Sequence, residues 1–311
     1  LKSTSSASLG AHTVESTALA NKATAAATAT MTVTDFDLMG PKGSKEIAVT
    51  ANDSAKTIAQ SVNDQASSTG VTATATTFVK LASVSAAAAT TMTLNGGGTA
   101  TAISFTLSAT SDLTAMKDAI NAVAGSTGVT AAFDGTSKAA LILNEADGDN
   151  ITITDFAQGT ATMTARALKA DGTTVSAVAA VTLTSGGTSD STIVTGSFQL
   201  TADAAFSVQD EETGTTDTSD ASGYFASTAT RSSTLSAVSA IDIGTTSGAR
   251  TAMKAIDGAL RMVSAQRSDL GSVSNRLDST VSNLTNISTN LAAGKGRIED
   301  ADFAAETTNL A

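Results

Sequence analysis

A seven-residue repeat near the end of the chain constrains its fold more than any other feature. An aliphatic side chain returns at every seventh position between residues 256 and 298. These residues are Ile256, Val263, Leu270, Leu277, Leu284, Leu291 and Ile298. A strict seven-residue repeat keeps one apolar side of an α-helix against a partner helix. We call these seven residues the heptad seam.

The residues between those of the seam are mostly Ala, Ser, Asn, Asp and Arg, without proline, so we expect one helix over residues 248–292. Ser247 is the expected N-cap, and Gly294 and Gly296 are expected to interrupt the helix. At a rise of ~1.5 Å per residue the helix would be about 65 Å long. An ordinary amphipathic surface helix is the alternative, but that length with one apolar side favours a long helical partner.

Three sequence blocks in this region resemble the C-terminal segment of bacterial flagellin, whose pattern is AQRxxLGAxxNR followed by RIxDxDFAxE. They are residues 264–277, 283–288 and 296–306. The resemblance implies an α+β protein with a long coiled-coil-type C-terminal helix in an inner domain and β-rich outer domains. Flagellins also have long N-terminal helices and a last C-terminal helix. The chain runs only from Leu1 to Ala311, so we expect a fragment lacking both.

An internal repeat is the second informative feature. The hexapeptide Ser-Thr-Gly-Val-Thr-Ala occurs at residues 68–73 and again at 126–131. Before each copy the pattern predicts a strand (46–50 and 103–107) and then a short capped helix. The expected caps and apolar helix residues are Asn52-Asp53-Ser54 with Ile58 and Val62, and Thr110-Ser111-Asp112 with Leu113, Met116 and Ile120; Asn63 and Asn121 end the helices. So short a helix is marginal alone and must pack on the strands. The two units, about 46–77 and 103–133, resemble the flagellin hook IN motif.

The rest of the chain before the long helix alternates like short strands separated by turns. Strands are expected at 30–35, 139–143, 151–154, 162–168, 181–183, 197–200 and 205–208. The predicted division is a connector (1–28), a β-rich outer variable region (29–208), a return connector (209–246), an inner-domain helix (247–299) and the start of a terminal helical domain (300–311). Within the return connector, Asp210–Ser222 is expected to be an exposed loop, and Tyr224-Phe225 to anchor the chain.

Composition argues against several functions. The net charge is −11 and the 18 basic residues are scattered, which argues against nucleic-acid binding. No apolar run approaches the ~20 residues of a membrane helix. With no cysteine, one histidine (His12) and no His-Glu-x-x-His, we expect no enzyme, metal site or cofactor. Asp147-Gly148-Asp149 and Asp210-Glu211-Glu212 could hold calcium but lack the spacing of a calcium loop.

The resemblance therefore implies a structural subunit of the flagellar filament, secreted by the flagellar export route and extracellular. It implies self-assembly with other flagellin subunits through the inner helices, with the heptad seam as the assembly surface. It also implies an export chaperone, a host innate immune receptor and O-linked glycans as partners, without singling out a site. The alternative is a hook-associated cap or junction protein, or a surface adhesin that binds glycans. Residues 297–303, Arg-Ile-Glu-Asp-Ala-Asp-Phe, favour flagellin.

Overall fold

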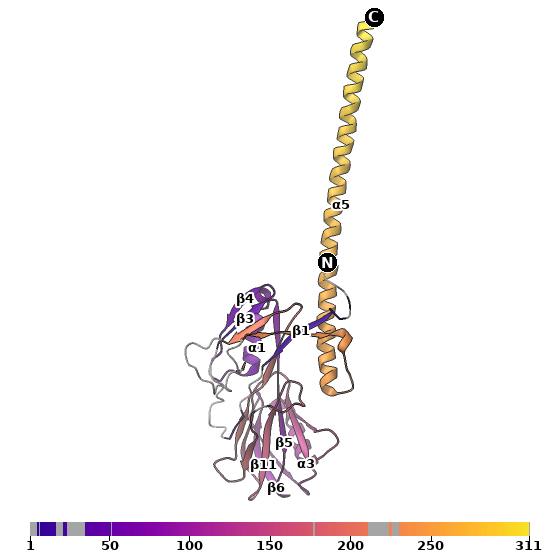
Figure 1. Ribbon diagram of the computed structural model, residues 1–311. Helices are drawn as coiled ribbons and strands as arrows, with labels where there is room; N and C mark the ends of the chain where they lie inside the picture. The colour runs from indigo at the N-terminus through magenta and orange to yellow at the C-terminus, as the bar shows by residue number, and fades with distance from the viewer. Residues whose placement is uncertain are drawn as a thin grey trace. The chain divides into compact units, whose positions relative to one another are not determined.

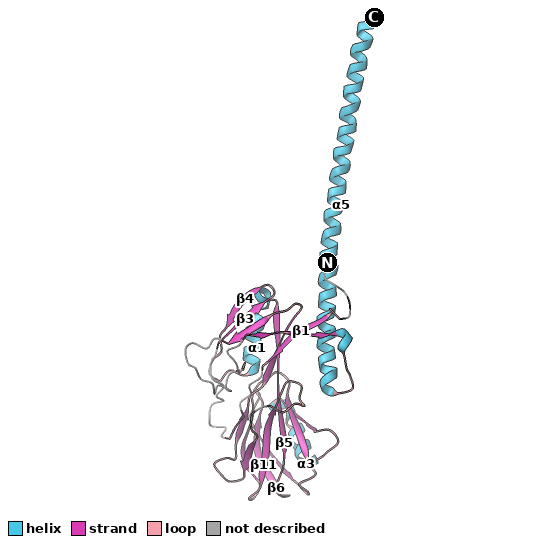
Figure 2. Cartoon of the chain, viewed as in Figure 1, coloured by secondary structure: helices cyan, strands magenta, loops and turns pink. Residues whose placement is uncertain are grey.

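The computed structural model confirms an α+β architecture of helices and antiparallel sheets (Figures 1 and 2). It describes residues 5, 7–16, 21–23, 35–50, 52–176, 178–210, 224–225 and 230–310. Residues 5–259 form one compact unit, and the second contains Leu260–Ala311. Two sequence expectations, most of the strand at 30–35 and nearly all of the loop Asp210–Ser222, lie outside the described residues.

The first repeat is a hairpin followed by two helices and a long strand. The elements are β3 (Phe36–Gly40), β4 (Gly43–Ile47), α1 (Ala55–Asp64), α2 (Ala66–Thr69) and β5 (Val71–Ala82). Ser54 caps α1 as expected, its side chain accepting a hydrogen bond from the Thr57 N–H. The strand expected at 46–50 instead ends at Ile47, because Gly43–Ile47 pairs across the two-residue turn with β3.

The second repeat has the same order of elements. They are β6 (Ala89–Asn95), β7 (Thr101–Thr106), α3 (Thr114–Ala122), α4 (Ala124–Thr127) and β8 (Val129–Phe133). Asp112 caps α3 from two residues before its start, accepting a hydrogen bond of 2.9 Å from the Thr114 N–H. Met116 and Ile120 are buried beneath the helix, as the spacing predicts.

The strands of the described residues form three sheets, and every pair among them is antiparallel. The largest runs β12 (Val181–Thr184), β11 (Thr162–Leu168), β5, β14 (Ser197–Ala202), β1 (Gly10–Glu15), β17 (Thr234–Ala237), with β9 (Ala140–Glu145) joining β8 to β5. The second runs β2 (Asn21–Lys22), β13 (Thr192–Val194), β10 (Ile151–Ala157), β6, β7. The third runs β16 (Arg231–Ser232), β15 (Ser207–Asp210), β3, β4.

The buried side chains that the structure describes form two hydrophobic cores within this unit, one around each repeat. Strand β5 belongs to both: Val71 and Ala73 lie in the first core, Val79 and Leu81 in the second. Its residues 71–76 pair with β14, and residues 77–82 pair with β9. The two repeats therefore share one continuous strand.

An aromatic cluster closes the first core. Phe225 meets Phe36 and Phe198 edge-on, with ring centroids 5.2 and 5.5 Å apart, and Tyr224 lies 5.2 Å from Phe198. All four rings are buried. The expected anchoring role of Tyr224-Phe225 is confirmed.

The segment expected to be a connector, residues 1–28, contains an integral strand. Strand β1 pairs with β14 on one edge and with β17 on the other. Its partners come from near residues 200 and 235, a pairing that local composition does not encode. Ala11 and Val14, its buried apolar side chains, are three positions apart, so no two-residue alternation distinguishes this strand in a Ser/Ala/Thr-rich segment.

Candidate assembly surface

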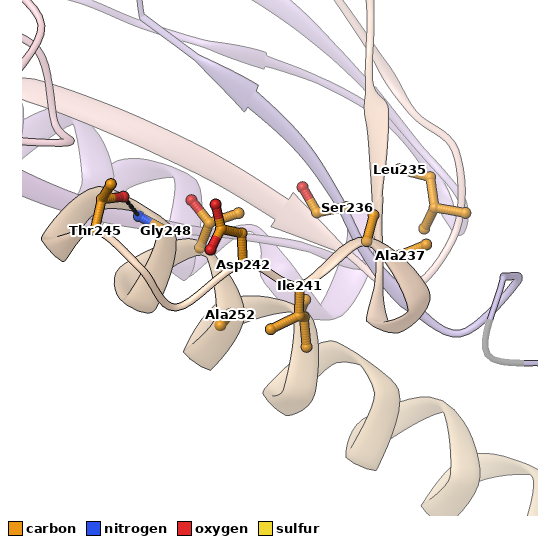
Figure 3. Close-up of a pocket in the computed structure, with 11 residues that line it drawn as sticks. Leu235, Ser236, Ala237, Ile241, Asp242, Thr245, Gly248 and Ala252 are labelled. Carbon is orange, nitrogen blue, oxygen red and sulfur yellow. Dashed lines mark hydrogen bonds between the residues drawn. The ribbon is translucent and has the colours of Figure 1, made fainter.

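Helix α5 (Thr246–Leu310) carries the heptad seam and is longer than expected. Thr245 rather than Ser247 caps its start, since its Oγ1 accepts a hydrogen bond of 2.9 Å from the Gly248 N–H (Figure 3). The expected interruption at Gly294 and Gly296 is wrong, because the helix runs through both. Each interior glycine costs only ~1 kcal/mol relative to alanine, and the surrounding Ala, Lys and Arg residues favour the helix.

The first turns of α5 belong to the β-rich unit. Ala252, Ala255 and Gly258 are buried, and a Cβ on Gly258 would lie 2.6 Å from the Gly10 carbonyl oxygen. Small residues thus let the helix approach the backbone of β1 closely.

Polar contacts hold the same turns. Lys254 Nζ donates to Gln199 Oε1 on β14, and the Arg250 guanidinium lies 4.7 Å from the centroid of the Phe78 ring. Burial lowers the pKa of Lys254 and raises that of Glu15 on β1, whose Oε1 accepts a 3.0 Å hydrogen bond from the Ala170 N–H. The helix start is fixed by apolar and polar contacts together.

The side chains of the heptad seam are all exposed. Val263 exposes 37% of its surface, and Leu291 and Ile298 expose 72% each. The other large apolar residues exposed along α5 are Met253, Leu260, Val273, Val281, Ile287, Phe303 and Leu310. None of these belongs to the seven-residue repeat. A run of exposed apolar side chains on this scale is typical of an interaction surface.

The part of α5 that carries the seam contains few strong helix formers. Several of its threonine hydroxyls form hydrogen bonds to the helix backbone. Thr280, Thr285 and Thr289 each donate a hydrogen bond of 2.8–2.9 Å to the carbonyl oxygen four residues earlier. Such bonds satisfy the hydroxyls without adding to helix stability. A helix of this composition gains stability mainly when another surface packs against it.

In both repeats an asparagine side chain links the short helix to the strand that follows it. Asn63 Oδ1 accepts from the Ala73 N–H (2.8 Å) and its Nδ2 donates to the Ala73 carbonyl (3.0 Å). Asn121 makes the same two bonds to Ala131, at 2.8 and 2.9 Å. The hexapeptide supplies both the alanine and a glycine with positive φ, Gly70 or Gly128. Sequence reasoning noticed these asparagines as helix ends and missed their role.

One cavity of about 500 Å³ lies between β17 and the start of α5 (Figure 3). Its walls include Leu235, Ser236 and Ala237 from β17 and Gly248, Ala252 and Ala255 from α5. The Asp242 carboxylate at its edge accepts a hydrogen bond of 2.8 Å from the Gly244 N–H. Asp242 is the one titratable side chain among the residues that line this cavity.

The acidic loop considered for calcium uses its carboxylates within the fold. Asp149 and Asp147 contact Lys56 Nζ at 2.7 and 3.4 Å. Glu145, buried with a raised pKa, accepts from the Asp147 and Asp149 N–H groups at 3.1 and 2.6 Å. Among the described residues, no group of three or more metal-binding side chains occurs, and no helix is long and apolar enough to cross a membrane. In the other run considered for calcium, Asp210-Glu211-Glu212, Glu212 lies outside the described residues.

Two family descriptions match the chain. The bacterial flagellin C-terminal helical region matches residues 253–311, and the flagellin hook IN motif matches residues 35–87 and 91–147. The IN matches contain both expected repeat units. The heptad seam lies within the first match and the two repeats within the second, so the matches define a protein of the flagellin class.

Curated relatives agree. Over 208 residues, 66% of the chain, it is 39% identical to B-type flagellin of Pseudomonas aeruginosa. Over 70 residues, 22% of the chain, it is 51% identical to flagellin A of Vibrio cholerae. The chain belongs to the bacterial flagellin family. It spans 39% of the length of the first relative and 18% of the second.

Among solved structures, the D2-D3 domains of the flagellar cap protein FliD from Escherichia coli align with 62% of the chain and 99% of that structure. The sequence identity is 14% and the TM-score 0.20. Similarity at that level supports no argument about fold or function.

Proposed function

We propose that this chain is part of a structural subunit of the bacterial flagellar filament, located outside the cell. The observation that carries the proposal is the exposed heptad seam, which lies on the segment matching the flagellin C-terminal helical region. Assembly with other flagellin subunits is the mechanism, and no catalytic step is required.

The seven seam residues are the proposed contacts: Ile256, Val263, Leu270, Leu277, Leu284, Leu291 and Ile298. Full burial of a side chain of this kind contributes ~1.5–3 kcal/mol. About half of each is already covered by its own helix, so a contact recovers only part of that. Seven such contacts along one helix still strongly favour a helix whose seam is packed over one whose seam is exposed to solvent.

We also propose that residues 29–208 form the outer region, exposed on the filament, with residues 247–299 in its helical layer and 300–311 beginning a terminal helical domain. The compactness of both repeats supports an independent outer region. An export chaperone, a host innate immune receptor and O-linked glycans stay predictions from the family. No observation on the described residues favours a cap protein or an adhesin.

The test replaces Leu277 and Leu284 with Asp in a full-length flagellin that contains this sequence. Two buried carboxylates on the seam are strongly unfavourable, so we expect secretion without filaments in electron micrographs. The control is Asn275→Asp with Ser279→Asp, exposed positions on the opposite side of the helix. Normal filaments from the leucine variant, or loss of filaments from the control, would refute the seam as an assembly surface.

A further inference from the structure

Five aspartate or asparagine residues of the chain are followed directly by glycine. They are Asn95, Asp134, Asp147, Asp171 and Asp257. Such a pair can rearrange without an enzyme. The backbone nitrogen of the glycine attacks the side-chain carbonyl carbon of the residue before it, and no Cβ on the glycine obstructs the approach. The attack requires a glycine N–H that is free of other hydrogen bonds, so the structure distinguishes the five pairs.

The Asn95-Gly96 pair is the most reactive by chemistry alone, because an amide loses ammonia more readily than a carboxyl group loses water. The fold protects this pair. The Gly96 N–H donates a hydrogen bond of 2.9 Å to the Thr127 carbonyl. A Cβ on Gly96 would lie 2.4 Å from Val129 Cγ2, so its backbone is closely packed. Asn95 itself pairs with Thr152 at the end of β6.

Three of the aspartate pairs are protected as well. The Gly172 N–H donates a hydrogen bond of 2.8 Å to the Lys169 carbonyl. Gly258 lies within α5, where the backbone hydrogen bonds of the helix engage its N–H. The Gly148 N–H interacts with the buried carboxylate of Glu145. In each of these pairs the attacking nitrogen is already occupied.

The Asp134-Gly135 pair lacks this protection. It begins the largely exposed loop between β8 and β9, and nothing lies within 4 Å of a Cβ built on Gly135. The structure describes this whole loop, and in it the Gly135 N–H has no hydrogen-bond partner. The Asp134 carboxylate is held by Lys80, whose Nζ lies 2.5 Å from Oδ2. Both side chains are partly exposed, and ion pairs of that kind are weak and open readily.

We propose that Asp134-Gly135 is a modification site at which the chain slowly isomerises to isoaspartate. The Asp134 carboxylate takes up a proton from water, and the Gly135 nitrogen forms a bond to Cγ and loses its hydrogen. The Cγ–O bond breaks, and one molecule of water leaves. Water then opens the succinimide ring at either carbonyl. One product is aspartate again, and the other is isoaspartate, in which the main chain runs through Cβ and Cγ.

The product would alter the closure of the β8–β9 loop. The Asp134 N–H donates a hydrogen bond of 3.1 Å to the Ala140 carbonyl, where the two strands separate. Isoaspartate adds one backbone atom at this point and displaces the carboxylate from Lys80. The amount of isoaspartate would therefore rise with the age of a subunit and change its surface. This goes beyond the filament proposed above, and because the chemistry does not depend on assembly, the chain alone can test it.

Trypsin places the five pairs on different peptides, because a lysine or arginine lies between each pair and the next. The folded chain is incubated for weeks at mildly acidic pH and digested. Mass spectrometry and an isoaspartate methyltransferase then measure the modified fraction of each peptide, with an unincubated sample as background. We expect isoaspartate in the peptide of residues 118–138 and background values in the other four. In urea, where the fold no longer protects the other pairs, Asn95-Gly96 should react first.

Two variants test the geometry. Lys80→Gln removes the ion pair and should raise the yield at Asp134 severalfold, with the other peptides unchanged. Gly135→Asn keeps a residue type that tolerates the positive φ at this position, but its Cβ lies beside the attacking nitrogen, so the yield at Asp134 should fall towards background. Modification of any other pair in the folded chain as fast as Asp134 would overturn the proposal. Unchanged yields at Asp134 in both variants would refute the assigned attack and restraint.

Discussion

The side chain of Asn63 and the backbone of Ala73 exchange two hydrogen bonds, and Asn121 and Ala131 repeat the arrangement in the second unit. Asn121→Ala leaves a half-buried N–H and carbonyl without partners, so we expect a loss of ~2–4 kcal/mol in unfolding free energy. Asn121→Asp should lose nearly as much, because a carboxylate cannot donate to the carbonyl. Urea denaturation measures both. The exposed Asn290→Ala serves as the control, and equal losses at Asn121 and Asn290 would contradict the assigned role.

Truncation of equivalent core residues tests whether the repeats are energetically alike. Val62 and Ile120 are fully buried under α1 and α3. Ile120→Ala should cost ~2–5 kcal/mol and Val62→Ala an amount near the lower end, because less volume is removed. Denaturant midpoints give the values. Hydrogen exchange showing either helix open in the unmodified chain would contradict the equivalence.

Gly258 should be irreplaceable where α5 meets β1. A Cβ there would lie 2.6 Å from the Gly10 carbonyl oxygen and 2.8 Å from Ala11 Cβ, so backbone must move. Gly258→Ala is therefore expected to separate the helix start from β1 and to speed amide exchange in β1 and β17. Gly271→Ala, with nothing within 4 Å of the added carbon, should instead raise helicity and stability by up to ~1 kcal/mol. If Gly258→Ala and Gly271→Ala changed stability and amide exchange alike, the close approach of Gly258 to β1 could not be the cause of the Gly258→Ala effect.

Glu15 gives a pH dependence of defined sign. Burial raises its pKa in the folded chain, so the folded state favours the protonated form. The contribution of Glu15 to stability is present below the unfolded pKa of ~4.3 and is lost as the pH rises through the folded pKa. Glu15→Gln should thus stabilise the protein at pH 7 and make no difference near pH 3.5. Melting temperatures at both values test this, with the exposed Glu46→Gln as control. If Glu15→Gln stabilised the protein equally at pH 7 and near pH 3.5, ionisation of Glu15 could not be the origin of the effect.

The boundaries of the outer region can be tested by comparing two polypeptides. Residues 29–208 lack β1, β17 and the Tyr224-Phe225 pair, all of which contribute to the first core or its sheet. Residues 5–259 retain them. We expect the longer polypeptide to unfold in one cooperative transition at a higher temperature than the shorter one in circular dichroism. Equal melting temperatures would show that the added strands and rings are dispensable.

The sequence predicted those elements that are determined by the spacing of residues close together in the chain. The spacing of Ile58 and Val62 predicted α1, and the exact hexapeptide predicted two like units. The seven-residue repeat predicted α5, although its end was placed too early because glycine was taken as a stop. In a helix stabilised over many residues, two glycines are tolerated.

Features that depend on distant pairing could not be predicted in this way. Strand β1 exists because β14 and β17 lie beside it, and its own residues resemble the flanking low-complexity sequence. The same holds for Asn63, whose importance depends on where the Ala73 backbone arrives. For the candidate surface, spacing identified the seam, and only the structure established that its residues are exposed.

Strand β5 has a mechanical consequence, because its twelve residues serve both cores. A pull along this strand loads its hydrogen bonds to β14, β9 and β11 in shear, so many bonds must break together. Neither repeat can be drawn away from the other without extracting a shared strand from both. Under drag in flowing liquid, the two repeats would resist extension as one body.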